Sequence, residues 1–350
     1  MKRYKPLFKE QNNLTNLSYA TKLIIEEAIK RGVKVSVADD ESQLLKLEKD
    51  GVIDYFMQCV TSQNSSVAEF MVSSKFVTKK LLNQNSYSTS RYFVYGNEED
   101  ALNDYEKFSD GDYVIKPNKG SKGEGVSFIN PDSSQAEYNK YVKLASKLTL
   151  DDRILIEEYI SGREYRFLIV DSKCLAIIER TPPRIIGDGA SSIQQLIDIK
   201  NKDKRRGDDS SYPLRKLKNG DREEITLKRK NLDFKSIPEK GDIIHLRDNA
   251  NIDDGGDSIG ILLEDIDYEY IKLAEDIAHL FQVNRYSAVD IKIEDIKNYI
   301  DKNSYSVIEV NAAPGFASME SPFEGVSVAV QEYVLDLYGF YKEGKNDEKI

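Results

Sequence analysis

The sequence has little of several residue types and patterns that mark particular classes of protein. Its 350 residues include only two cysteines, Cys59 and Cys174, and two histidines, so neither a disulfide framework nor a zinc site with Cys–Cys spacing is expected. No stretch approaches the roughly 18 apolar residues of a membrane span, and no apolar run follows the basic N-terminus as it would in a signal peptide. We therefore expect a cytoplasmic protein without a membrane segment.

Positive charge is also in the minority. Lys and Arg number 50 against 60 Asp and Glu, and the formal net charge of −10 argues against a nucleic-acid-binding surface. Hydrophobic residues make up 40% of the chain and charged residues 31%, as in ordinary globular proteins with a sizeable core. Small anionic ligands are still compatible with this composition, because a basic pocket can lie inside an acidic protein.

Apolar periodicity predicts an α/β (α+β) fold. A helix at 18–31, a stop at Gly32 and a strand at 33–38 predict a small α/β domain with a strand–helix–strand opening, which extends to about residue 74. Further strands are predicted at 112–117, 126–129, 153–159, 164–170, 173–180, 286–293 and 305–311, and further helices at 73–82, 266–283 and 326–340. Among these, 112–117 and 126–129 are predicted to form a hairpin with a glycine-rich tip, and 153–159 and 164–170 to flank a turn.

Residues 198–240 differ from the rest in composition. They are rich in Lys, Arg, Asp and Asn and have few large apolar residues. Such a composition is typical of a solvated, mobile excursion, and the alternative is a loop that folds over a substrate.

Two strands near the C-terminus carry oxygen-bearing side chains. Asp290 lies in the first strand, and Glu309 and Asn311 lie two apart on one face of the second. If the strands are antiparallel neighbours, these three side chains meet, and oxygen ligands of this kind suit magnesium. A single acidic residue is more often a solvated charge, but here the strands are otherwise apolar, so polar groups at their ends need partners.

A glycine-rich hairpin tip at 118–125 follows Lys116. Gly120, Gly123 and Gly125 let the backbone approach a ligand and turn its N–H groups inward, and Ser121 adds a hydroxyl. Such a tip is suited to cover nucleotide phosphates, although glycine-rich tips are common. It does not match the Walker A pattern.

A third candidate is the segment 157–164. A linking segment of this kind can bind adenine through its backbone at Glu157, Glu158 and Ile160, and Glu164 is spaced to accept hydrogen bonds from ribose. Taken alone, it reads as a surface turn with salt bridges.

Two arginines are candidates for stabilising a transferring phosphoryl group. Arg180 ends a strand and Arg247 begins the segment 247–256. Phosphoryl transfer needs positive charge on the moving group, and the planar guanidinium can hold two oxygens. Each arginine, taken singly, is more often part of a structural ion pair.

Taken together, these motifs resemble the ATP-grasp superfamily over nearly the whole chain. Lys75, within 73–82, resembles the family's first lysine helix, and Lys116 with the glycine loop resembles its second lysine and lid. Asp290, Glu309 and Asn311 resemble its Asp…Glu-x-Asn magnesium triad. The resemblance implies an ATP-grasp fold with a pre-ATP-grasp domain at 1–74, a lid subdomain at 75–160 and an ATP- and magnesium-binding subdomain at 161–350.

The same resemblance implies a reaction and its cofactors. A substrate carboxylate attacks the γ-phosphate of ATP, and an amine then displaces phosphate from the resulting acyl phosphate. Lys75, Lys116 and the glycine loop would hold the phosphates, and Arg247 and Arg180 would steady the transferring group. Two Mg²⁺ ions, with Mn²⁺ as a substitute, would bind at Asp290, Glu309 and Asn311.

Within the superfamily, the sequence is similar to two modules: the glutathione synthetase module of bacterial bifunctional glutathione enzymes, and the ATP-grasp module of cyanophycin synthetase. The stretches 61–68, 186–197, 205–207 and 246–256 carry this similarity. After Phe316, Ala317-Ser318-Met319-Glu320 departs from the basic or histidine-containing stretch of these relatives, and this leaves the acceptor substrate open.

Several functions are therefore weighed. The lead is a ligase that adds glycine to γ-glutamylcysteine, and the alternative within the class is an amino-acid ligase for a cyanophycin-like polymer or specialised peptide. A non-catalytic nucleotide-binding module and a kinase are the alternatives of other classes. The expected partners are small amino acids or peptides, and a homodimer is expected by analogy.

Overall fold

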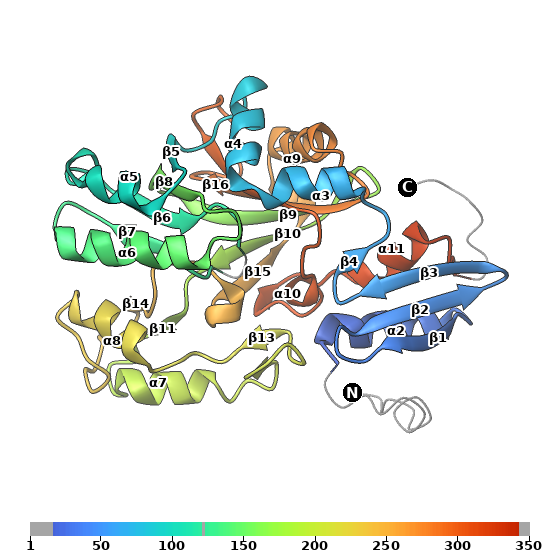
Figure 1. The fold of residues 1–350 in the computed structure, drawn as a ribbon. Coiled ribbons are helices and arrows are strands. Elements are labelled where there is room, and N and C mark those ends of the chain that lie inside the picture. The colour runs from blue at the N-terminus through green and yellow to red at the C-terminus, as the bar shows by residue number, and fades with distance from the viewer. Residues whose placement is uncertain (1–16, 121–122, 343–350) are drawn as a thin grey trace.

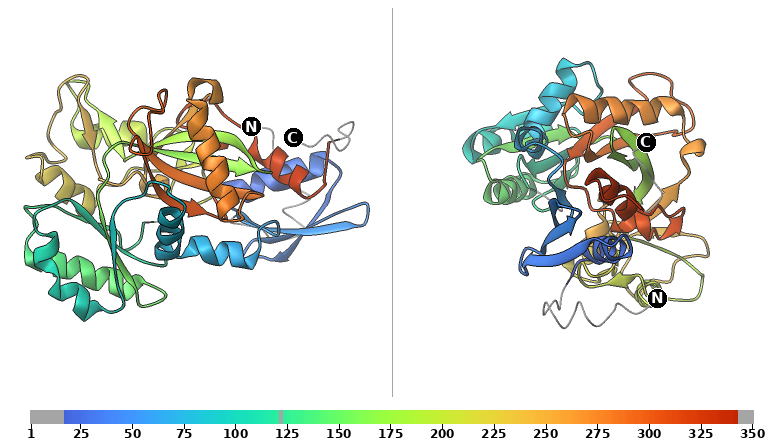
Figure 2. Two further views of the ribbon diagram at one scale, coloured as in Figure 1. Left: turned by 90° about the horizontal axis from the view of Figure 1, so that it is seen from above. Right: turned by 90° about the vertical axis from the view of Figure 1, so that its right-hand side faces the viewer.

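The computed structural model describes residues 17–120 and 123–342 (Figure 1). The described residues form one six-stranded sheet, two four-stranded sheets and two two-stranded sheets. A six-stranded sheet forms the middle of the molecule. A four-stranded sheet with α6 and a smaller unit with α7 and α8 lie at one end, and an N-terminal helix and sheet lie at the other, as Figure 1 and the left view of Figure 2 show. Among the described residues, no helix is both long and apolar enough to cross a bilayer.

The central sheet has the strand order β17-β16-β9-β10-β15-β18, and only the β15–β18 pair is parallel. Its strands are β9 (Arg163–Val170), β10 (Lys173–Thr181), β15 (Asp257–Ile261), β16 (Tyr286–Ile293), β17 (Tyr305–Asn311) and β18 (Glu324–Gly325). Both faces are covered, because successive side chains of a strand point to opposite faces. On β9, Phe167 and Ile169 belong to one core, and Leu168 and Val170 belong to the other.

Three helices cover the first face of this sheet. They are α3 (Ser66–Ser73), α4 (Lys75–Gln84) and α9 (Tyr268–Leu280). Serine side chains cap two of them, since Ser65 and Ser74 accept from backbone N–H groups at the starts of α3 and α4. The helix predicted at 266–283 is therefore present as α9, and the helix predicted at 73–82 as α4. The short 3₁₀ helix η3 (Leu263–Asp265) precedes α9.

The second face packs against N-terminal and C-terminal elements together. These are α2 (Tyr19–Lys30), α11 (Val330–Leu337), and the sheet β1 (Lys34–Asp39), β2 (Leu44–Lys49), β3 (Val52–Met57) and β4 (Val60–Thr61). One core joins Leu45 and Phe56 of the N-terminal sheet to Ala176 and Ile178 of β10 and to Val334 of α11. The short helix α10 (Ala317–Glu320) lies beside β10 and β15.

The N-terminal sheet corrects one prediction. Instead of a strand–helix–strand unit, one helix is followed by four strands in the antiparallel order β1-β2-β3-β4. The cause is the turn between β2 and β3, where Asp50 has φ 50° and Gly51 has φ 81°. Two successive residues with positive φ form the kind of tight turn that reverses a strand directly.

The second sheet has the order β5-β8-β6-β7 and is antiparallel. Its elements are β5 (Tyr92–Tyr95), α5 (Glu98–Asn103), η1 (Tyr105–Phe108), β6 (Tyr113–Pro117), β7 (Ser127–Ile129), α6 (Gln135–Leu148) and β8 (Ile154–Glu158). The predicted hairpin at 112–129 is present as β6–β7. The strands predicted at 153–159 and 164–170 are present as β8 and β9, and they lie in different sheets, because β8 pairs in this sheet and β9 in the central one. Residues 159–162 therefore connect two sheets.

The charged segment 198–240 belongs to a structured unit. The unit contains β11 (Arg184–Ile186), α7 (Ile193–Lys200), β12 (Arg206–Gly207), β13 (Leu214–Arg215), α8 (Asp221–Lys228), β14 (Ile243–His245) and η2 (Ile252–Asp254). The prediction of a solvated excursion is wrong here, because Leu214, Leu217 and Leu227 are buried and Leu217 and Leu227 pack in a core with Ile193 of α7. A few well-placed leucines suffice for a small core despite the charged composition.

Candidate functional site

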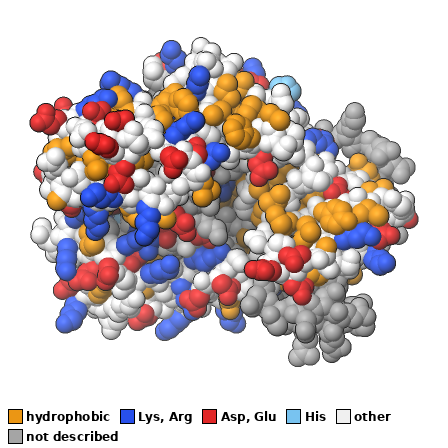
Figure 3. Space-filling model, viewed as in Figure 1, with side chains coloured by type: hydrophobic (Ala, Val, Ile, Leu, Met, Phe, Trp, Pro, Cys, Tyr) orange, Lys and Arg blue, Asp and Glu red, His pale blue; other side chains and the backbone are white. Residues whose placement is uncertain are grey.

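A cavity of about 1270 Å³ lies where these units meet. The face drawn in Figure 3 is hollowed at its centre, and Lys and Arg side chains gather along the lower rim of the hollow. The cavity is larger than the roughly 300–1,000 Å³ of a typical single-ligand site, so it has room for more than one ligand. The sequence-predicted site residues that line it are Lys75, Lys116, Gly120, Gly123, Gly125, Glu157, Glu158, Ile160, Glu164, Arg180, Arg247, Asp290, Glu309 and Asn311. The remaining one, Ser121, lies outside the described residues.

One part of the cavity lining, on β16 and β17, is acidic. Antiparallel pairing of β16 with β17 sets Asp290 directly opposite Glu309, and the Nδ2 of Asn311 lies 3.4 Å from Oδ2 of Asp290. Asp290 is buried, whereas Glu309 and Asn311 are partly exposed to the cavity. The structure thus brings together the three side chains that the sequence placed on neighbouring strands.

Two arginines hold Asp290. Arg166 on β9 forms a bidentate pair with it, with Nε 2.7 Å from Oδ1 and Nη2 2.6 Å from Oδ2. Arg180 on β10 lies 3.1 Å from the same Oδ2 and 3.1 Å from Glu164. Burial would raise the pKa of Asp290, but Arg166 and Arg180 outweigh it and lower the pKa below its ordinary value. Burial and the charge of Asp290 raise the pKa of Glu164.

Glu309 differs from Asp290 in having no ion pair among the described residues. Its charge still acts on its neighbours. It partly offsets the burial that lowers the pKa of Lys75, and it adds to Asp290 in raising the pKa of Arg166 against burial. No group of three or more His, Cys, Asp or Glu side chains arranged to hold a metal is found in the described part of the chain. A cation here would therefore have two carboxylates and the amide oxygen of Asn311 as protein ligands.

A second part of the cavity lining is basic. Glu157 on β8 is buried between two lysines, pairing with Lys116 of β6 through Oε1 and with Lys79 of α4 through Oε2 at 2.6 Å. Ser90 donates a further hydrogen bond to Glu157. Burial alone would raise the pKa of Glu157, but Lys116 and Lys79 lower it to about 2. The carboxylate therefore stays ionised and fixes both ammonium groups.

Lys75 lies one helical turn before Lys79 on α4. Its Nζ donates to the carbonyl oxygen of Gly120 at 3.0 Å, and burial lowers its pKa. The cation thus lies against the start of the glycine loop.

The glycine loop reaches across the cavity. Gly123 has φ 71°, a conformation that L side chains rarely adopt, and a Cβ there would lie 3.3 Å from Nδ2 of Asn251 and 3.4 Å from Nδ2 of Asn249. The loop therefore meets the segment 247–256, and glycine permits this close approach.

Arg247 begins that segment and is buried. Its Nε lies 2.5 Å from Glu223 of α8, and its Nη1 lies 2.6 Å from Asp254. The guanidinium is held between two carboxylates and lines the cavity, so its direction is fixed by the fold.

The segment that connects the two sheets offers its backbone. The N–H groups of Glu158 and Tyr159 donate to the carbonyl oxygens of Arg91 and Asp112, both at 2.9 Å. No hydrogen bond from the N–H of Ile160 to another described residue is found, and Ile160 lines the cavity. Glu158 itself is partly exposed and lies 3.7 Å from Arg91.

Sequence reasoning missed Lys79 and Arg166. Both had a signal: Lys79 is four residues after Lys75 and so shares its helix face, and Arg166 is two residues after Glu164 and so shares its strand face. What the sequence did not give was their partners, Glu157 and Asp290, which are distant in the chain.

The fold is similar to that of ATP-grasp proteins. A family model described as an ATP-grasp-like domain matches residues 15–67, and a crystal structure of a bifunctional glutathione synthetase from Pasteurella multocida is similar over 93% of this chain, with a TM-score of 0.68 and 28% identity. More particularly, the chain is related to the "Glutathione biosynthesis bifunctional protein GshAB" of Clostridium perfringens, with 34% identity over 92% of this chain, and to that of Listeria innocua, with 31% identity over 92%.

The match covers only part of each relative. The chain spans 41% of the length of the two curated relatives and 44% of the solved structure. The fold class predicted from the sequence and the predicted family resemblance are confirmed by these matches. The activity, the substrates and the roles of individual residues are proposals.

Proposed function

We propose that the chain is an ATP-dependent, ADP-forming ligase that joins a carboxylate to an amine through an acyl phosphate. The observation that carries this proposal is the cavity lining, which contains Lys116 and Glu157 of the Lys116–Glu157–Lys79 cluster together with Asp290, Glu309 and Asn311. These groups complement a nucleoside triphosphate and its cation, because the anionic phosphates need ammonium groups and the cation needs oxygen ligands.

The nucleotide would lie along the connection between the two sheets. The N–H of Ile160 is available for an adenine acceptor, and Glu164 faces the cavity next to it. Lys75 and Lys116 would contact phosphates. The glycine loop would cover them and exclude water, which would otherwise hydrolyse the acyl phosphate.

The donor set fits magnesium. Mg²⁺ is commonly held by one or two carboxylates together with substrate phosphates rather than by a cage of protein ligands, and Glu309 and Asp290 supply such a pair, with the amide of Asn311 beside them. When bound, the ion would neutralise charge on the phosphates. Two ions, with Mn²⁺ as a substitute, are part of this proposal.

The arginines of the cavity would act on the transferring group. Arg247, fixed by Glu223 and Asp254, presents a guanidinium whose orientation needs no reorganisation during the reaction. Arg180 would stabilise the same charge less directly, because Glu164 and Asp290 already hold it.

For the substrates, we propose γ-glutamylcysteine and glycine. Support comes from the relatives, which are named as glutathione biosynthesis proteins, and from a cavity with room beyond a nucleotide. The domain boundaries at 74 and 160, a cytoplasmic location and a homodimer belong to the same proposal.

The test is ADP release by the purified chain with ATP, Mg²⁺ and a panel of acids and amines, with mass spectrometry of the products. The panel contains γ-glutamylcysteine with glycine, and single amino acids and dipeptides paired with several amines. We expect ADP release that requires both an acid and an amine and yields a new amide. ADP release without amine dependence would indicate a kinase, and no substrate-dependent release would reject the ligase proposal.

A further inference from the structure

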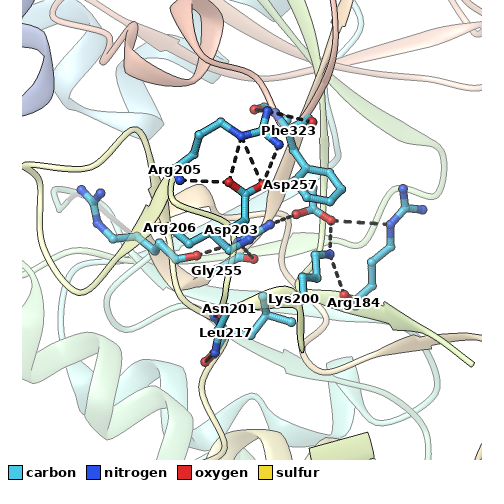
Figure 4. A network of polar contacts seen from close by, with 12 residues as sticks. Arg184, Lys200, Asn201, Asp203, Arg205, Arg206, Leu217, Gly255, Asp257 and Phe323 are labelled. Atoms are coloured by element: carbon cyan, nitrogen blue, oxygen red, sulfur yellow. Dashed lines mark hydrogen bonds and ion pairs between the residues drawn. The ribbon is translucent and has the colours of Figure 1, made fainter. Parts of the chain in front are cut away.

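Asp257 lies at the centre of a group of cations beside the cavity (Figure 4). It is fully buried at the start of β15, and three side chains surround its carboxylate: Arg206 at Oδ1, Lys200 at 2.5 Å from Oδ2, and Arg184 at 3.9 Å from Oδ2. One negative charge thus faces three positive charges, so the group as a whole is cationic.

Two of these cations have structural roles that occupy them. Lys200 and Arg206 contact Asp257 closely and also lie over the ring of Phe323, at 4.7 and 5.1 Å from its centroid. Arg206 donates further hydrogen bonds to backbone carbonyl oxygens of Arg215 and Gly255. Neither Lys200 nor Arg206 lines the cavity. They connect the segment after α7 to β15 and to the residues before β18.

Arg184 is different from both. It is the member of this group that lines the cavity, and 3.9 Å to Asp257 is its closest ion pair among the described residues. Lys200 and Arg206 approach Asp257 more closely, so they compensate its charge without Arg184. The guanidinium in Figure 4 extends away from the cluster beyond its Nε. This partly buried cation therefore has one long contact to a carboxylate that two other cations approach more closely.

Two further polar residues of the cavity lining each have an atom without a hydrogen-bond partner among the described residues. Thr181 is buried, and its Oγ1 has no hydrogen bond among the described residues. His245 lies opposite Arg184 in the β11–β14 pair, and its Nδ1 likewise has no partner there. Burial, Lys230 and Arg184 lower the pKa of His245. The cavity lining thus has a cation at Arg184 opposite His245, and unused hydrogen-bonding atoms on His245 and Thr181.

We propose that Arg184 binds a carboxylate of the amino-acid or peptide substrate, with Thr181 and His245 beside it. This rests on the proposed ligase function and extends it, because it requires a substrate with a carboxylate that does not react. The planar guanidinium suits a carboxylate, which it can contact through two N–H groups. The nucleotide phosphates have other cations, since Lys75, Lys116 and Arg247 also line the cavity.

The carboxylate has two possible sources, and the experiment separates them. Steady-state ADP release is measured for the wild-type chain, Arg184→Ala and Arg184→Lys, with γ-glutamylcysteine and glycine. Two neutral analogues are included: γ-glutamylcysteine with the glutamyl carboxylate as a carboxamide, and glycinamide. The control is Arg285→Ala, which removes a cation that pairs with Asp171 and does not line the cavity.

We expect Arg184→Ala to raise the KM of one substrate at least about tenfold, the order expected for loss of a hydrogen-bonded charge, with a smaller change in kcat. The KM of ATP should not change, and Arg184→Lys should recover part of the loss. The wild type should discriminate against the neutral analogue of that substrate, and Arg184→Ala should not. A general structural role would not produce this selective loss of discrimination.

Three results would overturn the proposal: unchanged KM values and discrimination, a raised KM of ATP alone, or the same effect in Arg285→Ala. If the wild type releases no ADP with any substrate, the ligase function fails instead. Calorimetric binding of γ-glutamylcysteine then decides about Arg184. Binding to the wild type that is lost in Arg184→Ala supports the site, and equal binding or none rejects it.

Discussion

Two buried carboxylates of the cavity, Glu157 and Asp290, are paired in the same way but differ in the further charges around them. Each lies between two cations, Glu157 between Lys79 and Lys116, and Asp290 between Arg166 and Arg180. Around Glu157, Lys75 adds a third cation, so the cluster is positive overall. Around Asp290, Glu164 and Glu309 add two carboxylates and Lys292 adds one cation, so acids and bases balance.

The comparison shows how one motif, an acid between two bases, yields sites that differ in net charge. The difference comes from the charged side chains that surround each motif and not from the central carboxylate. The lysines are compact point charges suited to phosphate, whereas the arginines orient Asp290 by a bidentate contact. Glu309, which has no such partner among the described residues, is the carboxylate left for a cation.

The largest effect is expected for Glu157→Gln, which would break the basic cluster. The change leaves Lys79 and Lys116 buried without their counter-charge. We expect a loss of about 3–5 kcal/mol in the free energy of unfolding, as for other buried pairs with one partner removed. Urea unfolding at pH 7 measures it, with Glu158→Gln as the matched control, because Glu158 is partly exposed.

The same variant should change the acid dependence of stability. The pKa of Glu157 falls from an ordinary 4.5 to about 2 in the folded chain, so its contribution is present above pH 4.5 and is lost as the pH falls toward 2. The wild type should lose this part of its stability over that range, and Glu157→Gln should not. Parallel pH profiles for the two proteins would contradict the assigned pairing.

Glu309→Gln should have the next largest effect, and it tests the proposed cation site at Asp290, Glu309 and Asn311. ADP release should fall by about 10²–10³-fold, the order found when one preorganised electrostatic contact is removed, and added Mg²⁺ should recover part of it. The free energy of unfolding should change by no more than about 1 kcal/mol, since Glu309 has no ion pair among the described residues. Activity within twofold of the wild type, measured at several Mg²⁺ concentrations, would remove Glu309 from the proposed cation site.

The smallest effect is expected for Arg91→Ala, which sharpens the contrast between burial and exposure. Arg91 lies 3.7 Å from Glu158 on the surface, with side-chain exposures of 69% and 39%. Exposed pairs of this kind contribute little, so unfolding free energy should change by less than about 0.5 kcal/mol. A larger loss in urea unfolding would mean that the Arg91–Glu158 pair stabilises the fold despite its exposure.

Much of the fold was predictable because strands β16 and β17 and helix α9 have strong periodic patterns. The positions of Asp290, Glu309 and Asn311 followed from the alternation of side chains along a strand. Their roles stay predictions. The antiparallel N-terminal sheet was not predicted, because a strand–helix–strand unit was expected there. Its signal in the sequence was Asp50-Gly51, which forms the tight turn between β2 and β3. The ion partners of Lys79 and Arg166 were beyond the sequence, because they depend on which distant strands become neighbours.

The shared core behind the central sheet limits how this protein can be recombined. Leu45 and Phe56 pack in one cluster with Ile178 and Val334, so residues from the first 60 and from the last 20 positions of the described chain bury each other. Asn64 adds to this, donating to the carbonyl oxygens of Tyr286 and Ala312 at the ends of the strands that carry the acidic site. A chimera that exchanged the N-terminal segment with that of a relative would therefore have to exchange α11 with it.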